Sequence, residues 1–312
     1  MTVLYISGTN FPSDIVLKML FLFTSASDIV IMINAISLLK ISRPGLWLVF
    51  VWLYLWPTGG FYTLLHSLKF WMGLLYCTFP LNFLVYGMND LADEDVDSQN
   101  PRKGNFIYGA KITKGQRRNL PLQIALVNIT AGCVLGICSN DWVYIFCWTS
   151  SAVCINFFYN NEPFRLSRKC PWELPCMIVG HFLIPLLSCR LNQVPFPSFF
   201  SWLFNGLLLA RSHIWLEFAD IDVDKGSDKR TIAVFLGKCT TLRLVVLITL
   251  IEASVGFLLL KSTLVCLFSL LGVFVFCTSS AQGAQNKVHV SVSQSLVGVC
   301  LMIYVWINRI LA

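Results

Sequence analysis

The chain contains few charged residues. Only 12% of its 312 residues are Asp, Glu, Lys or Arg, whereas soluble domains contain roughly 25%. Hydrophobic residues make up 56% of the chain, and the mean hydropathy is +0.69. Apolar runs of about 20 residues recur, and a run of that length can cross a bilayer as a helix. The composition excludes a soluble globular protein and predicts an all-α, polytopic membrane helical bundle in a lipid bilayer.

The sequence also lacks soft-metal ligand patterns and interdomain linkers. Its twelve cysteines include no CxxC pair and its four histidines are scattered, which argues against zinc sites and a disulfide framework. No Pro-, Gly- or Ser-rich linker divides the apolar runs, so we expect one membrane domain over residues 42–312. Residues 1–41 lack the basic start of a cleavable signal peptide and are expected to add an interfacial or extra helix. We attribute the net charge of +7 to membrane topology and expect no nucleic-acid partner.

The apolar runs predict about nine membrane-spanning helices. We place them at approximately 42–60, 68–90, 119–138, 141–159, 174–190, 197–216, 240–259, 262–282 and 289–311. The loops after the second, fourth, sixth and eighth helices hold 15 of the 23 Lys and Arg residues. Because such basic loops stay on the cytoplasmic side of a membrane, the second and sixth helices are predicted to end at the cytoplasmic face.

Ten of the sixteen acidic residues lie in two short segments that follow the second and sixth predicted helices. The candidate metal ligands of these segments are Asn89, Asp90, Asp93, Asp97, Glu217, Asp220 and Asp224. Spacings of four residues align most of them on one helical face, where like charges repel unless cations are present. Oxygen ligands without nearby His or Cys suit Mg²⁺. The sequence therefore predicts two facing clusters that hold Mg²⁺ around a diphosphate, against the alternative of solvated acidic helix ends.

The first segment, Asn89-Asp90-x-x-Asp93-x-x-x-Asp97, resembles the NDxxDxxxD motif of the UbiA superfamily of intramembrane prenyltransferases. Asp220-x-x-x-Asp224 resembles the second, DxxxD motif of that superfamily. Further similarities cover about residues 42–311, and those in residues 80–104 resemble its lycopene-elongase and chlorophyll-synthase-like branch. The sequence departs from the pattern at three positions, which are Glu217 for a common Asp, Asp228 for the usual glycine and Ser167 for a usual lysine.

The resemblance implies a Mg²⁺-dependent enzyme that ionises a prenyl diphosphate at the cytoplasmic face and transfers the prenyl group to a lipophilic acceptor. The catalytic residues it implies are Asp93, Asp97, Asp220, Asp224 and Tyr159, the last beside an allylic cation. The substrate-binding residues it implies are Arg102, Lys103, Arg165 and Lys225 for the diphosphate and Arg43 for the acceptor.

Three other functions compete with this interpretation. A UbiA-like terpene cyclase would use the same ionisation without an acceptor, and the acidic motifs do not separate the two. A CDP-alcohol phosphotransferase would need a contiguous DGxxAR…GxxxDxxxD motif, which the sequence lacks. A transporter or scaffold would place its charges near the middle of the bilayer, whereas these acids follow helix ends. The acceptor and the length of the donor chain are left open.

Overall fold

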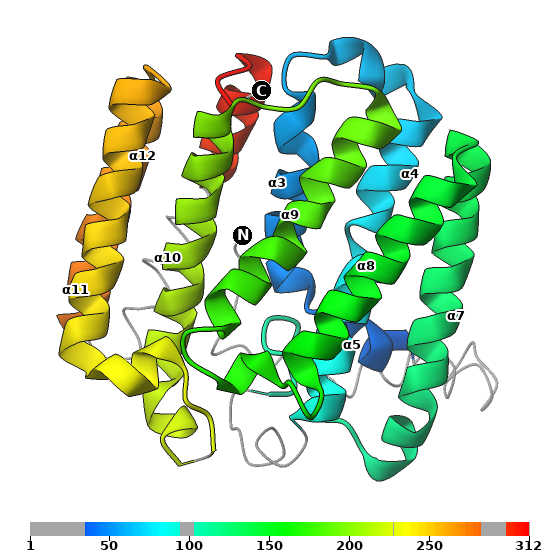
Figure 1. The fold of residues 1–312 in the computed structure, drawn as a ribbon, viewed down its shortest axis with the longest axis horizontal. Coiled ribbons are helices and arrows are strands. Elements are labelled where there is room, and N and C mark those ends of the chain that lie inside the picture. The colour runs from blue at the N-terminus through cyan, green and yellow to red at the C-terminus, as the bar shows by residue number, and fades with distance from the viewer. Residues whose placement is uncertain (1–34, 94–102, 227, 282–297, 312) are drawn as a thin grey trace, which may run out of the picture.

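The computed structural model describes residues 35–93, 103–226, 228–281 and 298–311, and the regular elements of these segments are all helical. The predicted all-α class is thus confirmed. Figure 1 shows the long helices side by side in one bundle, with loops gathered at its two ends. In chain order they are α3 (Trp47–Leu55), α4 (Leu68–Tyr76), α5 (Phe79–Ala92), α7 (Lys114–Ser139), α8 (Trp142–Asn160), α9 (Glu173–Asn192), α10 (Phe199–Asp224), α11 (Ile232–Ser254) and α12 (Thr263–Ala281).

Six segments of the described chain are long and apolar enough to cross a membrane. They are Ala35–Thr58, Leu68–Ala92, Gly115–Ser139, Trp142–Asn160, Glu173–Asn192 and Ile232–Leu259. The count of nine spans is not confirmed. α10 is long enough, but Asn205, Arg211 and His213 in its middle lower its hydropathy. The predicted extra helix within residues 1–41 lies mostly outside the described residues.

The second predicted span consists of two helices, α4 and α5, joined at Cys77 and Thr78. Pro80 starts α5, and proline fits a first helical turn but interrupts the interior of a helix because it lacks an N–H group. The Asn82 amide donates to the carbonyls of Cys77 and Thr78, at 2.9 and 2.6 Å, and so satisfies backbone groups that the break exposes. The sequence did not predict this break, although Pro80 was its signal.

Loop segments cover the end of the bundle where α5 and α10 end (Figure 1), and they include residues 42–46, 103–113, 161–172 and 228–231. We call this region the cap. The Gly45 N–H donates to the Phe106 carbonyl at 3.0 Å, which joins the start of the first span to the loop after α5. The Cys170 N–H donates to the Arg230 carbonyl at 2.8 Å, which joins the loops after α8 and α10. These contacts bring basic side chains from distant parts of the sequence to the ends of α5 and α10.

A buried ion pair and a hydrogen bond to it join α10, α11 and α12. Arg211 of α10 pairs through Nε with Glu252 of α11, and the Ser269 hydroxyl of α12 donates to the same carboxylate at 2.7 Å. The glutamate is fully buried and the arginine side chain is 7% exposed. A charge in the apolar part of a bundle is stable only when it is paired and hydrogen-bonded. The pair therefore fixes α10 against α11 and α12.

We predict that Arg211→Met lowers the free energy of unfolding by about 3–5 kcal/mol, because it leaves the Glu252 charge buried without its partner. The double variant Arg211→Met/Glu252→Met should regain most of that loss, since it removes both charges. Thermal unfolding of the purified protein in detergent measures both effects. A single variant as stable as the wild type would contradict this role of the pair.

Candidate active site

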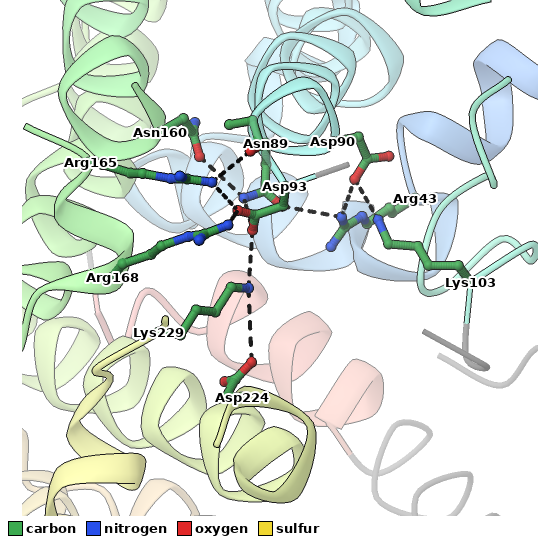
Figure 2. Close-up of polar contacts among 11 residues, drawn as sticks. Arg43, Asn89, Asp90, Asp93, Lys103, Asn160, Arg165, Arg168, Asp224 and Lys229 are labelled. Atoms are coloured by element: carbon green, nitrogen blue, oxygen red, sulfur yellow. Dashed lines mark hydrogen bonds and ion pairs between the residues drawn. The ribbon is translucent and has the colours of Figure 1, made fainter. Parts of the chain in front are cut away.

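The cap is organised around Asp90, in the last turn of α5 (Figure 2). Its Oδ1 accepts from Arg43 Nη2 and from Lys103 Nζ, both at 2.6 Å. The Asp90 side chain is 1% exposed. Burial of a carboxylate is costly unless cations pair with it, and here two separate loops supply them.

The loop from Lys103 to Gly109 is folded tightly over Asp90. Gly109 has a φ of +90°, and a Cβ atom at this position would lie 3.1 Å from Asp90 Oδ2 and 3.2 Å from Arg43 Nε. Only glycine combines this backbone conformation with such a close approach. Arg43 also has a left-handed φ of 50°, a strained conformation for a residue with a side chain. Its ion pair with Asp90 offsets that strain.

Asp93 follows directly at the end of α5 and has three basic partners. Arg168 Nη2 and Arg165 Nη2 lie 2.8 and 3.3 Å from Oδ1, and Lys229 Nζ lies 3.0 Å from Oδ2. Burial by itself would raise the pKa of Asp93, but Lys229 and Arg168 outweigh it and lower the pKa to about 2. Asp93 is therefore ionised throughout the physiological pH range.

The two acidic motifs face each other across Lys229. Its ammonium lies 3.0 Å from Asp93 Oδ2 and 3.9 Å from Asp224 Oδ1, so one cation lies between α5 and the end of α10 (Figure 2). Burial raises the pKa of Asp224 to about 6, against the opposing effect of Lys229. The spatial meeting of the two motifs, which the sequence predicted, is present in the structure.

Most of the predicted site residues lie in the cap. The structure brings together Asn89, Asp90, Asp93, Asp224, Arg43, Lys103 and Arg165. Asp220 is half-buried one turn before Asp224, and Tyr159 is half-buried at the end of α8, directly before Asn160. Asp97 and Arg102 lie outside the described residues. The roles of all these residues stay predictions.

Glu217 and Lys225 differ in position from the rest. Glu217 accepts from the Ala233 N–H at 3.3 Å and lies 3.1 Å from His213 Nε2. It thus binds the start of α11, where the first N–H groups have no partner within the helix. Lys225 is exposed, and it forms no ion pair with another described residue.

Sequence reasoning missed Arg168, Lys229 and Asn160 as site residues. Asn160 accepts from the Asn89 amide at 3.2 Å and so holds the first motif against the end of α8. Arg168 and Lys229 each directly follow one of the positions that depart from the family pattern, Ser167 and Asp228. The sequence does not show that these basic residues face the acidic motifs. They do so because the loops after α8 and α10 are joined by a hydrogen bond from the Arg230 N–H to the Arg168 carbonyl, at 3.1 Å.

The cap has the donor chemistry that Mg²⁺ requires. Asp90 Oδ2 is buried without a hydrogen-bond partner among the described residues, and Asn89, Asp93 and Asp224 add further oxygens nearby. In the described segments no three acidic, His or Cys side chains already converge as a metal site. Lys229 is the cation beside Asp93 and Asp224 in the structure. A metal bound by these carboxylates would take the place of its ammonium group.

We predict that Asp224 makes stability depend on pH. Its pKa is about 6 in the folded protein and 3.8 in the unfolded chain, so only the folded state keeps the proton between these values. The free energy of unfolding therefore falls as the pH rises through this window. Asp224→Asn should gain stability relative to the wild type over the same window, measured by thermal unfolding in detergent. The matched control is Asp222→Asn, whose carboxylate is 73% exposed; parallel profiles for Asp224→Asn and the wild type would contradict the prediction.

Comparison with known proteins places the chain in a family. Residues 45–294 match the model of the UbiA prenyltransferase family. Two lycopene elongase/hydratases of Corynebacterium glutamicum are 27% identical over 187 residues, which is 59% of this chain and 64% of the length of those relatives.

Solved structures share the fold. A UbiA homologue from Archaeoglobus fulgidus bound to GPP and Mg²⁺ is similar with a TM-score of 0.64 at 15% identity, over 86% of this chain and 97% of that one. A digeranylgeranylglyceryl phosphate synthase structure is similar with a TM-score of 0.54 at 14% identity, over 86% of this chain and 95% of the other. With the family model covering most of the sequence, the chain belongs to the UbiA prenyltransferase family.

Proposed function

We propose that the protein is a Mg²⁺-dependent intramembrane prenyltransferase, which ionises a prenyl diphosphate in the cap and transfers the prenyl group to a lipophilic acceptor. Family membership supports the reaction class. The neighbouring Archaeoglobus structures bound to GPP or DMAPP with Mg²⁺ support the donor and the metal. The basic loops of the sequence support a cap on the cytoplasmic side.

The proposal rests on a set of buried polar atoms, both donors and acceptors, that lack hydrogen-bond partners among the described residues. Arg165 Nε and Arg168 Nε are buried donors without an acceptor in the described part of the chain, and Asp90 Oδ2 is a buried acceptor without a donor. Leaving such groups unsatisfied is costly. A diphosphate would satisfy the two arginine donors and a divalent cation would satisfy the carboxylate. A bound pair of this kind removes both deficits.

The charge of the cap is consistent with an anionic ligand. Five basic side chains surround the two carboxylates at the end of α5, namely those of Arg43, Lys103, Arg165, Arg168 and Lys229. Among the described residues these five cations contact the carboxylates of Asp90, Asp93, Asp224 and the exposed Glu162. Their guanidinium and ammonium groups attract a diphosphate and stabilise the negative charge that develops on it as the C–O bond of the donor breaks.

The chain's own residues have distinct tasks in this reaction. Arg165 and Arg168 hold the leaving diphosphate, and Asn89, Asp90, Asp93 and Asp224 would hold Mg²⁺. The metal, when bound, adds positive charge beside the leaving group. Tyr159, half-buried at the end of α8, presents an aromatic face that can stabilise an allylic cation.

The acceptor is an apolar molecule that enters from the bilayer, and an unsaturated isoprenoid chain is the first candidate to test. Similarity to the lycopene elongase/hydratases supports this choice. The alternative is a terpene cyclase, which needs no acceptor. Incubation with a prenyl diphosphate alone and with added lycopene separates them, because only the cyclase forms a cyclic product from the donor alone.

We predict that Asp93→Asn and Asp224→Asn each reduce diphosphate release by a factor on the order of 100 or more, since each removes a charge that binds the metal. Excess EDTA should abolish release by the wild type. Asp222→Asn is the matched control, because Asp222 belongs to the same acidic segment but pairs with Lys238 at the surface, at 2.7 Å. Wild-type rates in the Asp93 or Asp224 variant, or full turnover in EDTA, would contradict the assigned site.

We predict that the cap faces the cytoplasm. Lys111 is exposed beside the cap and Thr63 is exposed at the other end of α3. In a cysteine-depleted background, Lys111→Cys should react with a membrane-impermeant thiol reagent only when the cytoplasmic face is accessible. Thr63→Cys should react only from the other side, and the reverse pattern would overturn the orientation.

A further inference from the structure

His181 is an imidazole within an apolar helix of the bundle. It lies near the middle of α9, which has the length and composition of a membrane span. Ionisable groups at such a depth are costly, and they often mark functional positions. His181 is half-buried, so it is not sealed within the core of the bundle. The proposed binding of diphosphate and metal does not involve His181.

The hydrogen bond of His181 defines which nitrogen is basic. Its Nδ1 lies 2.8 Å from the Met177 carbonyl oxygen. Because a carbonyl only accepts, Nδ1 carries the hydrogen and Nε2 carries the lone pair in the neutral ring. Within the described part of the chain this is the only hydrogen bond of the ring. Nε2 is therefore a basic nitrogen to which no described group of the protein is hydrogen-bonded.

A continuous line of side chains connects the cap to His181. The Arg43 guanidinium, which pairs with Asp90, lies 4.6 Å from the ring centre of Tyr86. The rings of Tyr86 and Phe50 stack with centres 6.3 Å apart, and the Phe50 ring meets the His181 ring edge-on at 5.3 Å. This line of contacts leads from the cap, where the diphosphate is proposed to bind, to the imidazole ring of His181.

The other histidines of the described chain are placed differently. His213 Nε2 lies 3.1 Å from Glu217 Oε1, and His66 is exposed at the end of the bundle opposite the cap. His289 lies outside the described residues. His181 alone among the described histidines thus combines a free Nε2 with a position beneath the cap.

We propose that His181 is a catalytic residue that accepts the proton released at the end of prenyl transfer, and that the acceptor is a carbon–carbon double bond. This inference rests on the proposed function. The C–O bond of the donor breaks and its electron pair leaves with the diphosphate. The π electrons of the acceptor then form a bond to C1 of the prenyl cation, which moves the positive charge onto the acceptor. An adjacent C–H bond gives its electrons to a new double bond, and its proton binds Nε2.

The surroundings of His181 are suited to this step. As Nε2 gains the proton, the Met177 carbonyl stabilises the imidazolium through Nδ1–H. The Phe50 ring, edge-on to the imidazole with ring centres 5.3 Å apart, makes the surroundings of this base apolar. The imidazolium returns its proton to water when the product departs, so the residue is regenerated. An apolar, aromatic wall with one basic nitrogen fits an unsaturated hydrocarbon better than a polar acceptor.

The variant His181→Asn tests the proposal. Its amide nitrogen can take the place of Nδ1 and donate to Met177, but it has no basic nitrogen. With a prenyl diphosphate, Mg²⁺ and lycopene, released diphosphate and coupled alkene are measured separately, because ionisation precedes proton loss. The ratio of coupled alkene to released diphosphate should fall by about 100-fold, and the prenyl alcohol formed by capture of water should replace the coupled alkene. His66→Asn is the matched control and should behave as the wild type.

Unchanged yields of coupled alkene from His181→Asn would overturn the proposal and show that another base, such as the departing diphosphate, takes the proton. A wild type that releases no diphosphate from any donor would instead refute the proposed function itself. A second measurement needs no active variant. In ¹⁵N-histidine NMR spectra of the wild type in detergent, with His181→Asn used for assignment, His181 should show the Nδ1–H tautomer; an Nε2–H tautomer would also overturn the proposal.

Discussion

Two buried carboxylates at the end of α5, Asp90 and Asp93, impose the strongest constraint on this structure. Burying a carboxylate is costly unless cations lie beside it, and the five basic partners come from loops far apart in the sequence. The tight turn at Gly109, the left-handed Arg43 and the hydrogen bonds between the loops after α8 and α10 all serve to deliver those cations. Pairing of opposite charges thus organises the cap.

The ion pairs of the cap can exchange partners when a ligand binds. Lys229 lies between the two acidic motifs, beside Asp93 and Asp224, which are proposed to hold Mg²⁺. With a divalent cation bound by these carboxylates, the Lys229 ammonium would be available to the diphosphate. Exchange of partners within one charge network requires small side-chain movements only, while the helices beneath, fixed by contacts such as the Arg211–Glu252 pair, keep their positions.

The sequence predicted those features that follow from local pattern. Apolar runs indicated the helices, and four-residue spacings within the two acidic segments indicated a meeting of α5 and α10, which the structure contains. It did not predict partners that depend on how loops fold over one another. Arg168 and Lys229 looked like ordinary basic loop residues, and Glu217 looked like a member of the acidic set although it also binds the start of α11. Such roles depend on tertiary contacts between segments distant in the sequence.

The central claim is that the cap binds a prenyl diphosphate together with a divalent cation. Isothermal titration calorimetry with a donor analogue that carries sulfur in place of the bridging C–O oxygen tests it directly, because such an analogue binds without ionising readily. The account predicts binding of the analogue to the wild type in Mg²⁺, and a large loss of affinity in EDTA. Equal affinity with and without the metal would contradict it.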